Sequence, residues 1–184
     1  IWRMAAYSAA LARALDWPLE RSEILRDAAA MHDTGKIGIP DEILKAPRKL
    51  TADEWVVMKQ HTSIGHSILR HSDAPLFQMA AEVALGHHEK WDGSGYPQGL
   101  AGEAIAETAR VVAIADVFDA LTMRRPYKEA WPVEQAIETI RSEAGKHFDP
   151  QMVETFIAIQ DEILEIKMKW DEEESKQESL EVRR

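Results

Sequence analysis

Six histidine and aspartate residues in the first two thirds of the sequence have the types and spacing expected of metal ligands. They are His32, Asp33, His61, His87, His88 and Asp116. The intervals from Asp33 to His61, from His61 to His87 and from His88 to Asp116 are 28, 26 and 28 positions. Because each interval leaves room for a helix, a turn and a return, we expect the six side chains to converge on one point.

Four imidazoles and two carboxylates form a ligand set that suits two divalent metal ions. Adjacent residues on a helix point about 100° apart, so each neighbouring pair could serve different ions. About three protein ligands per ion would leave positions open for water and phosphate, as a hydrolytic site requires. The chain has no cysteine, which excludes thiolate ligands, and the remaining donors suit Fe, Mn, Zn or Ni. Any one of these histidines alone is better explained as a polar core or surface residue, but the set predicts a shared metal site.

The segments that must position these ligands show helical rather than strand periodicity, which predicts an all-α fold. Helices are expected over residues 1–15, 19–33, 51–71, 75–90 and 108–123, with two more beginning at Pro132 and Pro150. Thr51 and Glu54 form a capping box, and Asp149 is placed to cap the last, long helix. Glycine and proline predict loops after Asp33 and over residues 92–102.

Composition limits the classes of protein to consider. The chain has 184 residues, 45% of them hydrophobic and 29% charged, which predicts one globular domain. A net charge of -10 argues against binding a nucleic-acid polymer, although a small anionic substrate remains compatible with metal ions and local cations. We expect no membrane span and, without cysteine, a cytoplasmic location. The start at Ile1, without methionine, indicates a piece of a longer protein.

Four sequence motifs resemble those of the HD-GYP phosphodiesterases. They are HDTGKIGIPDEIL at 32–44, KQHTSIG at 59–65, HHEKWDGSGYPQGL at 87–100 and ADVFDALTMRRPYK at 115–128. The likeness extends to about Phe156 and includes the glycine, tyrosine and proline at 95–97 that name the family. It implies an HD-superfamily helical bundle that hydrolyses cyclic di-GMP to linear pGpG or onward to GMP. It also assigns metal ligation to the same six residues.

The resemblance carries further expectations about residues and partners. The family pattern has a glutamate and a histidine just upstream, and Arg3 matches the arginine three residues after that histidine. The catalytic domain, residues 1–156, is therefore expected to be truncated at its N-terminus, with two metal ions here and a third open for the full-length protein. The family often carries an upstream receiver or sensor domain.

Several residues have both a functional and a plainer interpretation. Lys36 could bind a phosphate next to the catalytic His32-Asp33 pair, or be a solvated loop lysine. By resemblance, Arg125 and Lys128 contact substrate phosphate; the alternative is a favourable charge at a helix C-terminus. Tyr96 could stack on guanine and Gly95 could admit a ligand, or both could serve the turn alone. Asp119 could orient a ligand histidine or only pack between helices.

Residues 157–184 are expected to form an acidic helix with a frayed tail. The apolar residues Ile159, Ile163, Ile166 and Trp170 recur at helical spacing. This stripe predicts either a homodimer contact or an extra helix packed on the domain. From Asp171 onward the composition predicts fraying or disorder.

The function expected from the sequence is hydrolysis of a cyclic dinucleotide in second-messenger signalling. Two alternatives stay open. The first is another HD-superfamily nucleotide phosphohydrolase, against which the GYP loop argues. The second is a degenerate module that binds the dinucleotide without cutting it, against which the full set of internal ligands argues.

Overall fold

The computed structural model describes residues 1–123 and 130–181, which contain ten α-helices, two short 3-10 helices and no strand. The helices are α1 (Trp2–Ala14), α2 (Leu19–Ala29), η1 (Thr34–Gly38), α3 (Asp41–Leu44), α4 (Ala52–Lys59), α5 (His61–Leu69), α6 (Pro75–Gly86), η2 (Gly102–Ala104), α7 (Glu107–Thr122), α8 (Val133–Ser142), α9 (Pro150–Ala158) and α10 (Gln160–Glu181).

Helices α1 and α7 form the centre of the main hydrophobic core. Helix α1 packs against α2, α7, α9 and α10, and α7 also packs against α6 and α8. Alanines on α1 allow this close approach, while Tyr7, Phe118 and Phe156 fill the space between the helices and are fully buried. The core therefore holds rigid the helix that carries Asp116.

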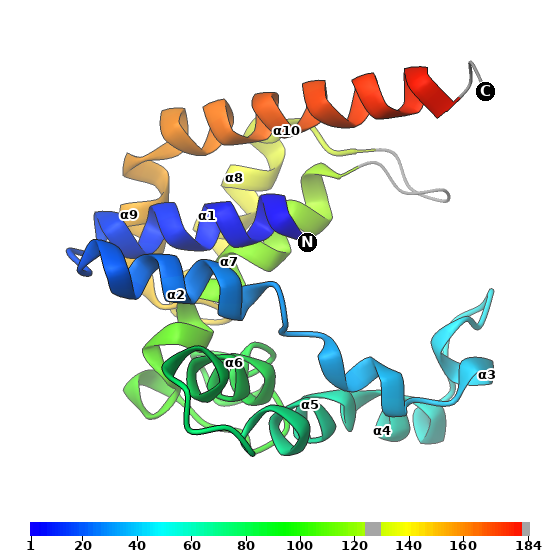
Figure 1. Cartoon of the computed structure of the whole chain (residues 1–184). Coiled ribbons are helices and arrows are strands. Elements are labelled where there is room, and N and C mark those ends of the chain that lie inside the picture. The colour runs from blue at the N-terminus through cyan, green and yellow to red at the C-terminus, as the bar shows by residue number, and fades with distance from the viewer. Residues whose placement is uncertain (124–129, 182–184) are drawn as a thin grey trace.

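A second layer presents the other expected ligands. Helix α5 packs against α6 and η1, and a small alanine-rich cluster joins α6 to α2. Figure 1 shows α10 running alongside α1 on one side of the molecule, with α3 to α6 on the opposite side. The expected ligands lie where α2, η1, α5, α6 and α7 come together.

Several helix boundaries differ from the sequence prediction. Helix α2 ends at Ala29, so His32 and Asp33 lie in the following turn, and the predicted loop after them contains η1 and α3. The helix predicted over 51–71 is divided at Gln60, and His87 and His88 follow the end of α6. Pro132 precedes α8 rather than starting it. The capping box at Thr51 and the Asp149 cap are both confirmed.

The C-terminal segment is also two helices, because α9 and α10 meet at Ile159. Ile163 is fully buried in the core, and the partly buried Ile159 and Ile166 pack against it, so three positions of the stripe contribute to the extra packed helix. Helix α10 continues as far as Glu181, past Asp171, so the fraying predicted from there onward stays a prediction.

A buried ion pair fixes this arrangement. The Nε of Arg3 donates to the Oδ1 of Asp119 at 2.7 Å, and the Nη1 of Arg3 bonds Asp171 of α10, also at 2.7 Å. Arg3 and Asp119 are 4% and 8% exposed. Asp119 therefore joins α7 to α1 and α10, so the structure favours its packing role over that of orienting a ligand histidine.

Candidate metal centre

Three of the predicted ligand histidines are oriented in the same way. The Nδ1 atoms of His32 and His61 each lie 2.8 Å from a main-chain carbonyl oxygen three residues earlier, and that of His87 lies 3.0 and 3.1 Å from two carbonyl oxygens of its preceding turn. A carbonyl can only accept, so Nδ1 must donate. In a neutral ring the lone pair then resides on Nε2, which is free to bind a metal.

Asp33 lies between these three rings. Its Oδ2 is 3.3 Å from the Nε2 of His32, and its Oδ1 is 3.6 and 3.9 Å from the Nε2 atoms of His61 and His87. The Nζ of Lys36 contacts the Oδ2 of Asp33 at 2.5 Å. Residues from the turn after α2, from η1, from the start of α5 and from the turn after α6 thus meet at one carboxylate.

The ligand atoms form two overlapping groups. The first consists of His61, His87 and His88, and the second of His32, Asp33 and His87; within each, the candidate atoms lie within 4.8 Å of one another. Asp116 reaches the second group, because its Oδ1 is 3.8 Å from the Nε2 of His32. The structure therefore brings together all six predicted ligands, and His87 belongs to both groups.

The environment keeps most of these imidazoles neutral. Burial lowers the pKa of His61 and of His87, and burial together with the neighbouring His61 lowers the pKa of His88 to about 3. Burial opposes charge on His32 as well, but Asp33 and Asp116 raise its pKa above the ordinary value. At the partly buried Asp33, His32 and Lys36 overcome the effect of burial and hold the pKa well below its usual range.

These properties fit a metal centre. Within residues 1–123 and 130–181, the buried Nε2 atoms of His61 and His87 have no hydrogen-bond partner. Such unpaired groups cost free energy unless another ligand satisfies them. Neutral imidazoles with their lone pairs directed at an ionised carboxylate are the form in which these residues bind divalent metal ions.

Gly35 lets η1 approach α5 closely enough to align the centre. A Cβ atom at Gly35 would lie 1.9 Å from the carbonyl oxygen of His61 and 2.4 Å from the amide nitrogen of Gly65. Both are main-chain atoms, so no side-chain rotation can relieve the overlap. The distance between Asp33 and His61 therefore depends on glycine at this position.

We expect Gly35→Ala to weaken metal binding, because it must separate η1 from α5 and with it Asp33 from His61. A loss of about 10-fold or more in affinity, as for changes that misplace ligands, should appear in a metal titration. Gly38→Ala is the matched control, since the three atoms nearest to its added Cβ all belong to the flexible side chain of Ile64. Equal affinities of the two variants would contradict the role given to Gly35.

The GYP loop closes over one edge of the centre. The Tyr96 ring stacks on His88 with a centroid distance of 4.8 Å and an interplanar angle of 27°, and the Nζ of Lys59 lies 5.5 Å from the Tyr96 ring centroid. A Cβ at Gly95 would lie 2.3 Å from the amide nitrogen of Lys90, which gives this glycine a structural reason inside the turn. A role for Gly95 against a ligand stays a prediction.

Two residues near the centre were not singled out from the sequence. Lys59 is half-buried beside Tyr96, and the helix that carries it gave no signal beyond the nearby His61. Glu89 is 2% exposed and accepts hydrogen bonds from the main chain of the GYP loop. The sequence feature that could have pointed to Glu89 is its position as a charged residue between a histidine pair and a glycine-rich loop. Two predicted substrate contacts, Arg125 and Lys128, lie outside the described residues.

A family model described as an HD domain matches residues 2–152. The chain belongs to the HD domain family. This confirms the relationship predicted from the four motifs. In the described part of this HD domain, none of the helices has the length and hydropathy needed to cross a bilayer.

Relatives of this HD domain are phosphodiesterases by name. The cyclic di-GMP phosphodiesterase of Thermotoga maritima is 49% identical over 148 residues, covering 80% of this chain and 40% of that protein. The 3'3'-cGAMP-specific phosphodiesterase 2 of Vibrio cholerae is 43% identical over 167 residues, covering 91% and 32%. The cyclic di-GMP phosphodiesterase response regulator RpfG of Xanthomonas campestris is 48% identical over 155 residues, covering 84% and 41%. The chain thus spans less than half the length of each.

Two solved structures share the fold. A cyclic GMP-AMP phosphodiesterase of Vibrio cholerae, V-cGAP3, has a TM-score of 0.65 at 19% identity and covers 89% of this chain and 44% of its own. Bd1817 of Bdellovibrio bacteriovorus, an HDG"Y"P protein, has a TM-score of 0.63 at 22% identity and covers 86% and 50%. The all-α HD-superfamily fold predicted from the sequence is confirmed.

Proposed function

We propose that this HD domain hydrolyses a phosphodiester bond of a cyclic dinucleotide, cyclic di-GMP first among them, to linear pGpG or GMP. The observation that carries the proposal is the pair of buried Nε2 atoms of His61 and His87, which find no hydrogen-bond partner among the described residues and face Asp33 beside the GYP loop. The names of relatives at 43–49% identity support the substrate class.

In this proposal, the six ligands hold two divalent ions, with Fe, Mn, Ni and Zn all compatible with the donors. When bound, such ions lower the pKa of water and offset charge that develops on the phosphoryl oxygens. Asp33, whose Oδ2 faces His32 and whose Oδ1 faces His61 and His87, would hold the two halves of the centre together. Asp116, on the rigid α7, would fix the position of the group around His32.

Substrate recognition would involve the residues around the rim of the centre. The ammonium of Lys36, at the edge of the centre beside Asp33, is placed to neutralise a phosphate oxygen. The partly buried Tyr96 presents an aromatic ring on which a nucleobase could stack. Gly95 precedes Tyr96 in the loop, and its main chain is proposed to contact the ligand, while the place of its missing Cβ is occupied by main-chain atoms of residues 88–90.

We expect the double variant Arg125→Ala, Lys128→Ala to raise the KM for cyclic di-GMP without changing metal content, because both cations are proposed to contact phosphate. The difference from the parent protein should shrink at high salt, where exposed charges are screened. Arg124→Ala, a neighbouring cation outside the family's phosphate-contact pattern, is the control. Unchanged kinetics in the double variant would remove both residues from the binding site.

The decisive experiment is turnover by metal-reconstituted protein, with cyclic di-GMP and 3'3'-cGAMP supplied separately and products resolved by chromatography. Linear dinucleotide or mononucleotide products support the proposal, and the ratio of the two rates gives the preferred substrate. Metal-loaded protein that binds a dinucleotide without cutting it would show the degenerate module instead. Hydrolysis of another nucleotide alone would show a different HD-superfamily phosphohydrolase.

The setting of the domain is part of the proposal. The chain covers 32–41% of the three relatives, and the name of one of them includes response regulator. We therefore infer a longer, cytoplasmic signalling protein in which a receiver or sensor domain precedes residues 1–156. Mass spectrometry of the native protein, with its location by cell fractionation, tests both statements.

A further inference from the structure

Glu89 has an unusual environment for a carboxylate. Its side chain is 2% exposed, yet within residues 1–123 and 130–181 it forms no ion pair with a cation. Instead, Oε1 accepts a hydrogen bond from the amide of Gln98 at 2.7 Å and Oε2 accepts one from the amide of Leu100 at 3.0 Å. Burial of a carboxylate costs free energy unless its oxygens are satisfied, and here the two loop amides satisfy them.

The GYP loop comprises residues 92–102, and the two amides belong to its second half, residues 98–100, which we call the far limb. At the near end of the loop, the amide of Tyr96 donates to the carbonyl oxygen of His88 at 3.1 Å. The main chain of Tyr96 is therefore attached to His88, a predicted metal ligand. The residues that follow Tyr96 are attached to Glu89, which comes directly after His88 in the sequence. The position of the Tyr96 ring against His88 depends on both attachments.

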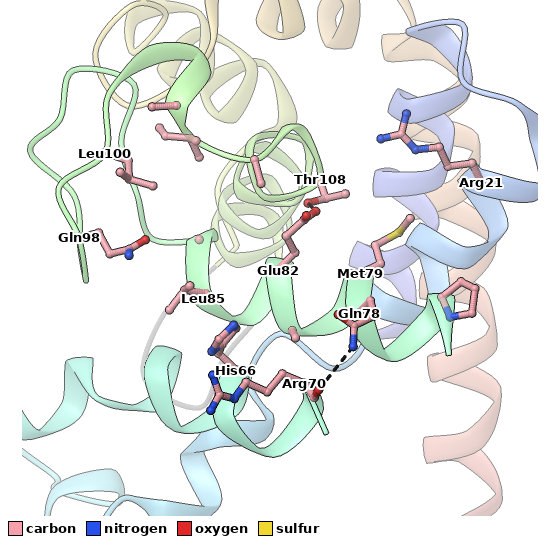
Figure 2. A pocket seen from close by; sticks show the side chains of 16 residues that line it. Arg21, His66, Arg70, Gln78, Met79, Glu82, Leu85, Gln98, Leu100 and Thr108 are labelled. Atoms are coloured by element: carbon pink, nitrogen blue, oxygen red, sulfur yellow. Dashed lines mark hydrogen bonds between the residues drawn. The ribbon is translucent and has the colours of Figure 1, made fainter. Parts of the chain in front are cut away.

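The outer side of this limb borders a pocket and is not packed against a core. Gln98 and Leu100 line a pocket of about 530 Å³ together with residues of α5 and α6, among them His66 and Glu82 (Figure 2). Gln98 is exposed and Leu100 is only half-buried. Since the limb has open space on that side, the carboxylate of Glu89 is what ties residues 98–100 toward the centre, while the amide of Gly102, which donates to the carbonyl oxygen of Trp91 at 2.8 Å, closes the base of the loop.

We propose that Glu89 is a positioning residue that sets the place of Tyr96, and through it the affinity for the nucleobase of a cyclic dinucleotide. This inference rests on the proposed function for its substrate. It differs from a role in metal binding, because the carboxylate oxygens of Glu89 are engaged by the amides of Gln98 and Leu100. Glu89 should therefore affect KM more than kcat.

The test is Glu89→Gln, which keeps one acceptor oxygen and turns an amide group toward a main-chain N–H. The KM for cyclic di-GMP should rise roughly tenfold, the scale of one lost base-aromatic contact, with kcat and metal content nearly unchanged. Methyl 4-nitrophenyl phosphate, a diester without a nucleobase, should be hydrolysed as by the parent protein. Combining Glu89→Gln with Tyr96→Ala should raise KM no further than Tyr96→Ala alone, because both act through one ring.

Glu82→Gln is the matched control. Glu82 also faces the pocket, but in the described part of the chain its side chain accepts a hydrogen bond from the Oγ1 of Thr108, at 2.7 Å, and none from the GYP loop. Glu82→Gln should therefore leave the KM for cyclic di-GMP unchanged. If Glu89→Gln does not fold, Glu89→Asp, which keeps both oxygens but withdraws them by one methylene, should change KM in the same direction.

Amide hydrogen exchange of the metal-free protein separates this inference from the proposed function. Glu89→Gln should speed exchange at Gln98 and Leu100 while α1 and α7 stay protected. Unchanged loop exchange, or a KM that rises equally for the simple diester, would overturn the positioning role. If the parent protein cuts no cyclic dinucleotide, the substrate assignment fails, and the exchange data still decide whether Glu89 holds the loop.

Discussion

Asp33→Ala and His88→Ala are each expected to remove bound metal and to lower turnover by at least about 10²- to 10³-fold, the scale seen when a group that stabilises developing charge is lost. Asp33 lies within 3.3 to 3.9 Å of three imidazole Nε2 atoms, so its removal takes away the one carboxylate that they share. His88 completes the group with His61 and His87.

The fold should survive both changes, because the hydrophobic core lies around α1 and α7 and not at these side chains. Metal analysis by mass spectrometry and circular dichroism of the same samples measure the two effects separately. His71→Ala serves as the control, since His71 is an exposed histidine in the turn after α5. Retained turnover in either ligand variant would remove that residue from the centre.

Arg3→Met is expected to lower the free energy of unfolding by about 3–5 kcal/mol, the usual cost of removing one partner of a buried ion pair. The change would leave Asp119, which is 8% exposed, without the cation that the described residues place beside it. It would also release the contact between α1 and Asp171 of α10. Urea denaturation followed by circular dichroism measures the effect.

Arg13→Met is the matched comparison on the same helix. Its guanidinium lies 2.9 Å from Glu162 of α10 and 3.8 Å from Glu23, but its side chain is 37% exposed. Screening by water limits such pairs to about 1 kcal/mol or less. A loss for Arg3→Met no larger than for Arg13→Met would show that the buried pair contributes no more than an exposed one.

The sequence allowed the convergence of ligands to be predicted, because helix-length intervals between histidines and aspartates restrict the ways in which the chain can return. It did not show where α2 ends. No glycine or proline stands between Ala29 and Asp33, and the turn there is closed by His32, whose ring bonds back to the carbonyl oxygen of Ala29. A side-chain interaction of this kind leaves no periodic signal.

Long-range polar contacts were also beyond prediction. Arg3 and Asp119 are 116 positions apart, and only the packing of α1 on α7 brings them together. The sequence therefore left two roles open for Asp119. Glu89 presents the same difficulty over a shorter span, because the path of the loop decides which amides face its carboxylate.

The hydrogen bonds from Nδ1 have a consequence for the entropy of metal binding. Each of the three rings is held by a carbonyl oxygen of its own turn, so its side-chain torsions are restricted before an ion arrives. Fixing a flexible side chain on binding costs on the order of 0.5–1.5 kcal/mol, and here folding has already met that cost for three ligands. The arrangement of the three imidazoles should therefore be equally rigid with and without bound ions. A chelator should remove the ions without unwinding the helices around them.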